Sequence, residues 1–258
     1  MPFFAANLSL MFTEHAFLDR FQAAADAGFD AVEFLFPYEF EADAIAERLA
    51  EAELEQVLFN LPPGDWAGGD RGMAALPERK EELQRSVTTA LAYAQALGTR
   101  RLHMMAGIAD PADPVHQRAY RDALAFVADA TGEKDITLLI EPLNPRDMPG
   151  YFLNSFDLAV AAITDLGRPN VKLQFDVYHR QILHGDVLRA LEQMMPIIGH
   201  VQIASVPGRN EPGTGELDDF RVLEALDELG YRGFVGCEYR PKEATLDGLD
   251  WLDRFEEC

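Results

Sequence analysis

The stretch VKLQFD at Val171–Asp176 is a short apolar run that ends on an acid, and three other apolar runs in the second half of the chain end with an acid or an amide. They are LLIE at Leu138–Glu141, HVQI at His200–Ile203 and FVGCE at Phe234–Glu238. The polar residues Glu141, Asp176, Gln202 and Glu238 follow one another at intervals of 35, 26 and 36 residues. Each interval has room for one buried strand and one helix, so the pattern predicts repeated strand–helix units.

The rest of the chain continues this alternation. Strands are expected at Phe3–Asn7, Ala31–Phe34, Leu54–Phe59, Arg101–Met105, Thr137–Glu141, Val171–Asp176, Gly199–Ile203 and Phe234–Glu238. Helical patterns occupy Ala16–Ala27, Ala42–Ala52, Glu78–Leu97, Pro114–Ala130, Phe156–Leu166, Val187–Met194, Phe220–Leu229 and Thr245–Phe255. Eight such units predict an α/β fold, a (β/α)8 barrel in a single domain over residues 1–258. A doubly wound open sheet is the rival, but no GxGxxG motif follows the first strand.

Composition narrows the class of partner. The net charge of −22 argues against nucleic acid and against anionic membranes, since both bind surfaces rich in Lys and Arg. The two cysteines, Cys237 and Cys258, suggest no disulfide framework, so we expect a reducing cytoplasm. The start MPFFAANLSLMF lacks the basic region of a signal peptide, and no apolar stretch reaches the roughly 18 residues of a membrane span.

The four polar strand ends predict a metal site. The carboxyl ends of parallel barrel strands meet on one face, so Glu141, Asp176, Gln202 and Glu238 are expected in one pocket. Three carboxylates and an amide oxygen repel one another unless a cation lies between them, and hard oxygen ligands suit Mg²⁺ or Mn²⁺. For a single acid, a helix cap or a surface charge is an equally good interpretation. Four together favour a metal-dependent enzyme.

Further candidates lie next to these strand ends. His179, expected in a loop three residues after Asp176, could hydrogen-bond a substrate oxygen. Arg209 in VPGRNEPGTGE could hold a substrate carboxylate, and Arg71 in GDWAGGDRG is a second candidate for that task. His103 ends the fourth strand and could line the pocket or be a rim histidine. Three long loops, Asn60–Pro77, Pro142–Ser155 and Ala204–Asp218, are expected on the same face.

Several motifs carry a resemblance to a known family. They are FAANLSLMF, GFDAVEFLFPY, FNLPPGDWAGGDRGMAALPERKEE, LLIEPLN with PGYFL, QFDVYH, GHVQIA, GRNEPGTGE and GCEYRPK. Through them the chain resembles hydroxypyruvate isomerases of the xylose isomerase-like TIM barrel superfamily, which also holds the D-tagatose 3-epimerases. The segments MFTE and FDAVEFLFPY resemble the related 2-oxo-tetronate isomerases as well.

The resemblance implies roles for individual residues. Glu141, Asp176, Gln202 and Glu238 would bind the metal, and Glu141 and Glu238 would also transfer protons. His179 and Arg209 match positions that contact substrate in the wider superfamily. The implied reaction interconverts hydroxypyruvate and tartronate semialdehyde through an enediol, and a hydride shift stays open as another route.

Other functions remain as alternatives. A 2-oxo-tetronate isomerase or a ketose 3-epimerase would use the same site on a different substrate. Relatives that cut DNA at abasic sites need a basic groove, which a charge of −22 with six histidines does not favour. A small-molecule sensor without turnover would leave the paired glutamates unused. The expected partner is a small 2-oxo acid, and a homo-oligomer is compatible with the sequence.

Overall fold

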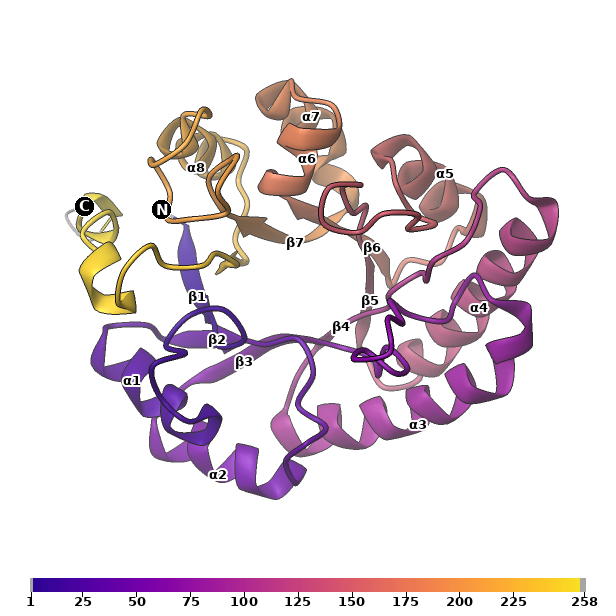
Figure 1. Cartoon of the computed structure of the whole chain (residues 1–258), viewed down its shortest axis with the longest axis horizontal. Coiled ribbons are helices and arrows are strands. Elements are labelled where there is room, and N and C mark those ends of the chain that lie inside the picture. The colour runs from indigo at the N-terminus through magenta and orange to yellow at the C-terminus, as the bar shows by residue number, and fades with distance from the viewer. Residues whose placement is uncertain (1, 256–258) are drawn as a thin grey trace.

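The computed structural model describes residues 2–255, in which eight parallel strands close into a barrel (Figure 1). The strands are β1 Phe3–Asn7, β2 Ala31–Glu33, β3 Glu55–Asn60, β4 Arg101–His103, β5 Thr137–Ile140, β6 Val171–Asp176, β7 Ile198–Ile203 and β8 Phe234–Cys237. They pair in chain order, and β8 closes the ring on β1, with Phe3 opposite Phe234. The predicted (β/α)8 barrel is confirmed.

The helices surround the strands as an outer layer (Figure 1). They are α1 Arg20–Asp26, α2 Ala42–Glu51, α3 Lys80–Leu97, α4 Pro114–Gly132, α5 Phe156–Leu166, α6 Val177–Leu183, α7 Val187–Met194 and α8 Asp219–Glu228. Short 3-10 turns precede α1 and α3 at Phe17–Asp19 and Pro77–Arg79, and a third, Met195–Ile197, precedes β7. None of the helices within residues 2–255 is long and apolar enough to cross a bilayer.

One expected helix is wrong. The segment Thr245–Phe255 contains two 3-10 turns, Thr245–Gly248 and Leu252–Phe255, instead of one α-helix. Its backbone approaches Glu211 so closely that a Cβ on Gly248 would lie 2.5 Å from the Glu211 Oε1 atom. Glycine also has a low helix propensity, so this tertiary contact outweighs the weak apolar pattern of the segment.

A second correction concerns α6, a segment for which the sequence predicts no helix. It has only seven residues, too few for a full amphipathic period, and it follows β6 without a connecting loop. His179 is therefore a helical residue in the first turn of α6 rather than a loop residue.

The barrel interior changes from apolar to polar along the strands. Ala5, Ala31, Leu58 and Leu139 belong to a small apolar cluster of their own. Because side chains two residues apart on a strand share a face, the residues that follow them on the inside are Asn7, Glu33, Asn60 and Glu141. All four of these polar residues are buried. The strands thus place an apolar layer below and a polar layer at their carboxyl ends.

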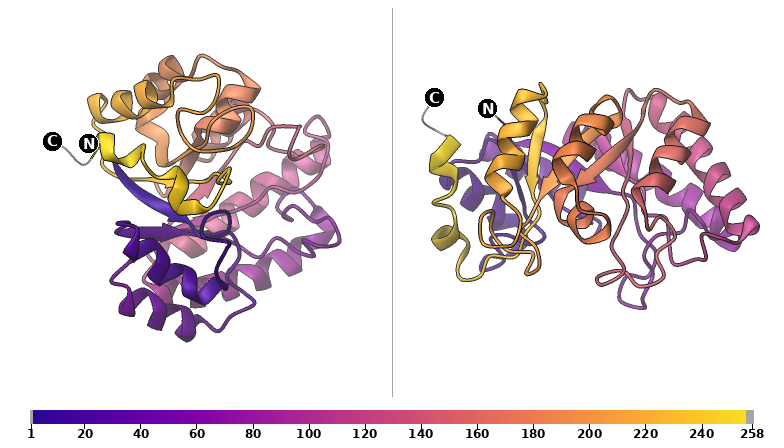
Figure 2. Two further views of the ribbon diagram at one scale, coloured as in Figure 1. Left: turned by 60° about the vertical axis from the view of Figure 1, so that its left-hand side comes forward. Right: turned by 90° about the horizontal axis from the view of Figure 1, so that it is seen from above.

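The three long loops occur where they are expected. They connect β3 to the turn before α3, β5 to α5, and β7 to α8. In the right-hand view of Figure 2 the long loops project from one side of the molecule. This is the side of the polar strand ends, where active sites of such barrels are built.

Candidate active site

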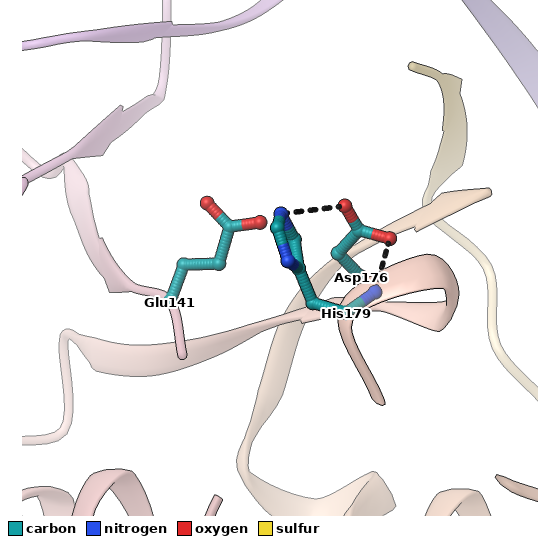
Figure 3. Close-up of side chains that lie close together, drawn as sticks. All are labelled: Glu141, Asp176 and His179. Carbon is teal, nitrogen blue, oxygen red and sulfur yellow. Dashed lines mark hydrogen bonds and ion pairs between the residues drawn. The ribbon is translucent and has the colours of Figure 1, made fainter. Parts of the chain in front are cut away.

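Three buried side chains meet at the ends of β5 and β6 (Figure 3). Glu141 directly follows β5, Asp176 ends β6, and His179 lies in α6. Each offers one ligand atom, and these atoms lie within 4.8 Å of one another. This buried group could hold a metal ion, with the two carboxylates as its oxygen donors.

The carboxylate of Asp176 is divided between two tasks. Its Oδ1 caps α6 and accepts hydrogen bonds from the backbone N–H groups of Tyr178 at 2.7 Å and of His179 at 3.4 Å. Its Oδ2 is buried and has no hydrogen-bond partner among the described residues. The helix therefore fixes the carboxylate and leaves one oxygen directed at the site.

The loop after β5 sets the tautomer of His179. The backbone N–H of Asn144 lies 3.0 Å from the His179 Nδ1 atom and donates to it, so Nδ1 is the unprotonated nitrogen. The proton is then on Nε2, which lies 3.6 Å from Asp176 Oδ2. Burial, with Arg209 and His103 nearby, holds the pKa of His179 well below its usual value. His179 is thus a neutral donor that faces the site.

Arg209 binds the acids of β6 and β8. Its Nη2 lies 2.5 Å from Glu238 Oε2 and 3.5 Å from Asp176 Oδ2, and its Nη1 lies 3.5 Å from Asp147 Oδ2. The guanidinium also stands 4.9 Å above the ring of Tyr178. Burial disfavours the charge of Arg209, but the surrounding carboxylates outweigh this cost and raise its pKa. Arg209 therefore belongs to the acid cluster.

Gln202 lies beside Asp176, its register partner on β6. Its Oε1 accepts a hydrogen bond from Gln174 Nε2 at 2.6 Å, and its Nε2 donates to Glu33 Oε1 at 2.7 Å. An amide oxygen has two lone pairs, so one remains for a further partner. Gln202 is buried, as are the three acids.

The acids of the site are hard to ionise together. Burial raises the pKa of Glu141 well above its usual range, and the charges of Glu238 and Asp176 raise it further. The pKa of Glu238 is raised to about 8, mainly by burial, although Arg209 opposes the shift. Burial also raises the pKa of Asp176. A single arginine thus does not compensate three buried carboxylates.

A divalent cation fits this arrangement. Glu141 Oε1 and Asp176 Oδ2 are buried without a hydrogen-bond partner among residues 2–255, both belong to the group of Figure 3, and Asp176 Oδ2 has only the longer contacts with Arg209 at 3.5 Å and His179 at 3.6 Å. Such orphaned oxygens are costly unless a proton or a cation satisfies them. The donors are carboxylate and amide oxygens, which suit hard divalent ions.

Arg71 lies in the long loop after β3. Its Nη1 donates to the backbone carbonyls of Asp70 at 2.6 Å and of Trp66 at 3.1 Å. Its guanidinium lies 4.0 Å from the centroid of the Trp66 ring, and this ring packs against Phe36. The guanidinium is thus held by backbone and aromatic contacts at the loop side of the barrel.

Two polar groups in the interior were not among the predicted ligands. His103 at the end of β4 has its Nε2 3.8 Å from Glu141 Oε2 and its Nδ1 3.2 Å from Asn60 Oδ1. Burial lowers the pKa of His103 to about 3, so it is neutral. Glu33 ends β2 and contacts Gln202. The rule that found the acids of β5 to β8 also applies to Glu33, because AVE is an apolar run ending on an acid.

The comparisons with known proteins decide the family. The family model described as "Xylose isomerase-like TIM barrel" matches residues 21–255. The chain belongs to this family. It is 52% identical to a 2-oxo-tetronate isomerase of Cupriavidus necator, an alignment that covers 99% of each chain. It is 41% identical to the hydroxypyruvate isomerase of Escherichia coli K12 over 98% of each.

A solved structure agrees with this assignment. A crystal structure from Brucella melitensis, described as an AP endonuclease of family 2, is 50% identical and superposes with a TM-score of 0.97, covering 99% of each chain. The resemblance carried by the sequence motifs is therefore confirmed at the level of the family.

Proposed function

We propose that this protein is an isomerase that interconverts hydroxypyruvate and tartronate semialdehyde. The observation that carries the proposal is the buried group of Glu141, Asp176 and His179, with the charge of Glu238 acting on Glu141, in a barrel related to isomerases of short 2-oxo acids. We further propose Glu141, Asp176, Gln202 and Glu238 as ligands of Mg²⁺ or Mn²⁺. His179 has its proton on the nitrogen that faces the site, so we propose it as a donor to a substrate oxygen.

The two glutamates would transfer the protons. One carboxylate removes a proton from C3 of hydroxypyruvate, and the electrons of the broken C–H bond form a C2–C3 double bond, which leaves the C2 oxygen as the negative oxygen of an enediolate. The other glutamate delivers a proton to C2, while the hydroxyl proton of C3 passes to the oxygen on C2. A raised pKa suits a carboxyl group that must both take and give a proton near neutrality. A bound divalent ion would supply Lewis-acid stabilisation of the negative charge on the substrate oxygens.

Both arginines are proposed to bind the substrate carboxylate, with different consequences. The Arg71 hydrogen bonds to the backbone use Nη1, which leaves the other edge of the fork for a carboxylate. Arg209 already contacts Glu238, so the loss of Arg209 would disturb the proton-transfer group as well.

Arg71→Met should therefore raise KM with little change in kcat, whereas Arg209→Met should raise KM and also lower kcat. Steady-state kinetics of the two variants separate these effects.

Charge favours an isomerase over a nuclease. The Brucella melitensis structure carries the name of an endonuclease. A protein that binds DNA neutralises phosphates with Lys and Arg, yet this chain has 22 basic and 44 acidic residues. A small anion needs only a local cation, which Arg71 and Arg209 provide.

A 2-oxo-tetronate isomerase is the second candidate, and the 52% identity to such an enzyme favours it. To decide, metal-stripped protein is given each acid separately, with and without Mg²⁺ or Mn²⁺, and the products are followed by NMR. Metal-dependent turnover that prefers hydroxypyruvate is the expected result. A preference for the four-carbon acid would transfer the assignment to the second candidate. No turnover of either acid would contradict both.

We also propose a cytoplasmic location and a small-molecule partner only. Cys237 is a buried free thiol, which is compatible with a reducing compartment, and Cys258 lies outside the described residues. Fractionation of the source cells with activity measured in each fraction tests the location. Light scattering of the purified protein tests the expectation of a homo-oligomer.

A further inference from the structure

Next to Gln202, one of the proposed metal ligands, lies a buried carboxylate that the reaction does not use. Glu33 on β2 is 1% exposed and lies inside the barrel. Its Oε1 accepts hydrogen bonds from Asn7 Nδ2 at 2.9 Å and from Gln202 Nε2 at 2.7 Å. Its Oε2 lies 2.7 Å from His200 Nε2. Three buried side chains from β1 and β7 thus converge on one carboxylate.

The neighbouring strand makes room for this carboxylate. Gly236 on β8 is the register partner of Gln202, and a Cβ at Gly236 would collide with the carboxyl group of Glu33. A side chain on β8 at this level would displace Glu33 from Gln202. The glycine and the three hydrogen-bonding partners together hold Glu33 in one place.

Glu33 determines the orientation of the Gln202 side-chain amide. An ionised carboxylate only accepts hydrogen bonds, whereas an amide both donates and accepts, so the amides of Gln174 and Gln202 could turn over without Glu33. Because Glu33 needs a donor, Gln202 must direct its nitrogen at Glu33 and its oxygen toward β6. Asp176 is the residue of β6 that pairs with Gln202. Only the oxygen of an amide can bind a divalent ion, so this orientation decides whether Gln202 can act as a ligand.

We propose that Glu33 is a positioning residue for the metal centre: it fixes the Gln202 amide so that its oxygen is available to the metal. The inference rests on the proposed metal ligands. The supporting partners of metal ligands commonly contribute a factor of about 10 to 100 to metal affinity. Loss of Glu33 should weaken binding to a similar extent without removing any ligand.

The test is a Mn²⁺ titration of metal-stripped protein, with free Mn²⁺ measured by electron paramagnetic resonance. Glu33→Gln should weaken Mn²⁺ binding about 10- to 100-fold, because a glutamine accepts either orientation of the neighbouring amide. A second substitution, Gln202→Glu, added to Glu33→Gln should restore binding, because a carboxylate presents an oxygen whichever way it turns. The gain from Gln202→Glu should be larger in the Glu33→Gln background than in the wild-type background, whereas a purely structural role of Glu33 predicts the same gain in both.

His200→Gln is the matched control, because His200 contacts the other oxygen of the same carboxylate. It should lower the melting temperature but weaken Mn²⁺ binding much less than Glu33→Gln. The inference would be overturned if Glu33→Gln bound Mn²⁺ with wild-type affinity or if His200→Gln weakened Mn²⁺ binding equally. It would also be overturned if Gln202→Glu failed to restore binding to Glu33→Gln. If Glu33→Gln does not fold, Gly236→Ala, which displaces the same carboxylate, should weaken binding instead, and unchanged affinity there would also overturn it.

Failure of the proposed function gives a different result. Wild-type protein that binds Mn²⁺ but converts neither acid contradicts the proposed reaction and leaves the role of Glu33 intact. Active wild-type protein with unchanged Mn²⁺ affinity in Glu33→Gln contradicts the role of Glu33 and leaves the reaction intact.

Discussion

At the scale of single residues, the proposed proton transfer relies on two buried glutamates, Glu141 and Glu238. Glu141 follows β5 and Glu238 follows β8, burial raises the pKa of both, and the charge of Glu238 raises the pKa of Glu141 further. General acid–base groups typically contribute a factor of about 10² to 10⁴ to a rate. The two glutamates would therefore account for most of the sensitivity of the reaction to substitution.

The first prediction concerns these glutamates. Glu141→Gln and Glu238→Gln should each lower kcat by about 100-fold or more, because an amide cannot transfer the proton. Circular dichroism should show an intact fold. Glu81→Gln, on the exposed side of α3, is the control and should have wild-type kcat. More than a tenth of the activity in either site variant would exclude the two-glutamate scheme.

At the scale of elements, the join between β6 and α6 gives one carboxylate two separate tasks. Asp176 caps the helix with Oδ1 and directs Oδ2 at the site. Asparagine is as good an N-cap as aspartate, but its side chain lacks the charge that a metal ligand contributes. Replacement of Asp176 by asparagine should therefore affect metal binding alone, whereas replacement by alanine should also lower the stability of the fold.

The second prediction follows from this division. Asp176→Asn should keep the melting temperature within a few degrees and lose most of the Mn²⁺ affinity. Asp176→Ala should lose the affinity and also about 1 kcal/mol of stability, the usual contribution of an N-cap. Calorimetric melting and Mn²⁺ titration of both variants provide the check. Equal melting temperatures of the two variants would contradict the capping role.

Elements also show what the sequence can predict. The strands of the second half were predicted to within one residue, because each is a short apolar run that ends on a polar residue. Helix α6 could not be predicted from periodicity, because seven residues capped by a site residue carry no amphipathic pattern. The segment Thr245–Phe255 has such a pattern. Its contact with Glu211 joins residues that are distant in the sequence, so a local pattern cannot predict it.

The candidate site shows the same limits. Strand ends and family motifs predicted Glu141, Asp176 and His179 as site residues, and the structure brings these three together. The tautomer of His179 depends on a backbone N–H 35 residues away, so it needed the structure. Glu33 could have been predicted from AVE alone, because this short apolar run in the first half of the chain ends on an acid, as the runs of the second half do at Glu141, Asp176 and Glu238.

At the scale of the whole molecule, the buried acids connect stability to pH. The folded protein holds the pKa of Glu238 at about 8, against an ordinary value of 4.5, and Glu141 is shifted in the same direction. Between these two pH values the folded state binds more protons than the unfolded state. The resulting contribution to stability is complete below pH 4.5 and is lost as the pH rises through about 8.

The third prediction is that metal-stripped protein melts at a lower temperature at pH 8.5 than at pH 5.5, by at least ~3 °C, since 1 kcal/mol corresponds to about 2 to 4 °C in a protein of this size. Glu238→Gln, which does not titrate, should show a smaller fall. Added Mn²⁺ should stabilise the protein more at the higher pH, because it binds the ionised acids. A melting temperature that rises with pH without metal would contradict the prediction.

The most direct test of the whole account is the isomerisation of hydroxypyruvate by Mg²⁺-loaded protein in deuterated water, followed by NMR in single-turnover conditions. Because the two glutamates exchange their protons with solvent, the account predicts tartronate semialdehyde that carries deuterium at C2, formed slowly or not at all by Glu238→Gln. Product that retains the original C3 hydrogen at C2 would show a hydride shift and contradict proton transfer between the glutamates.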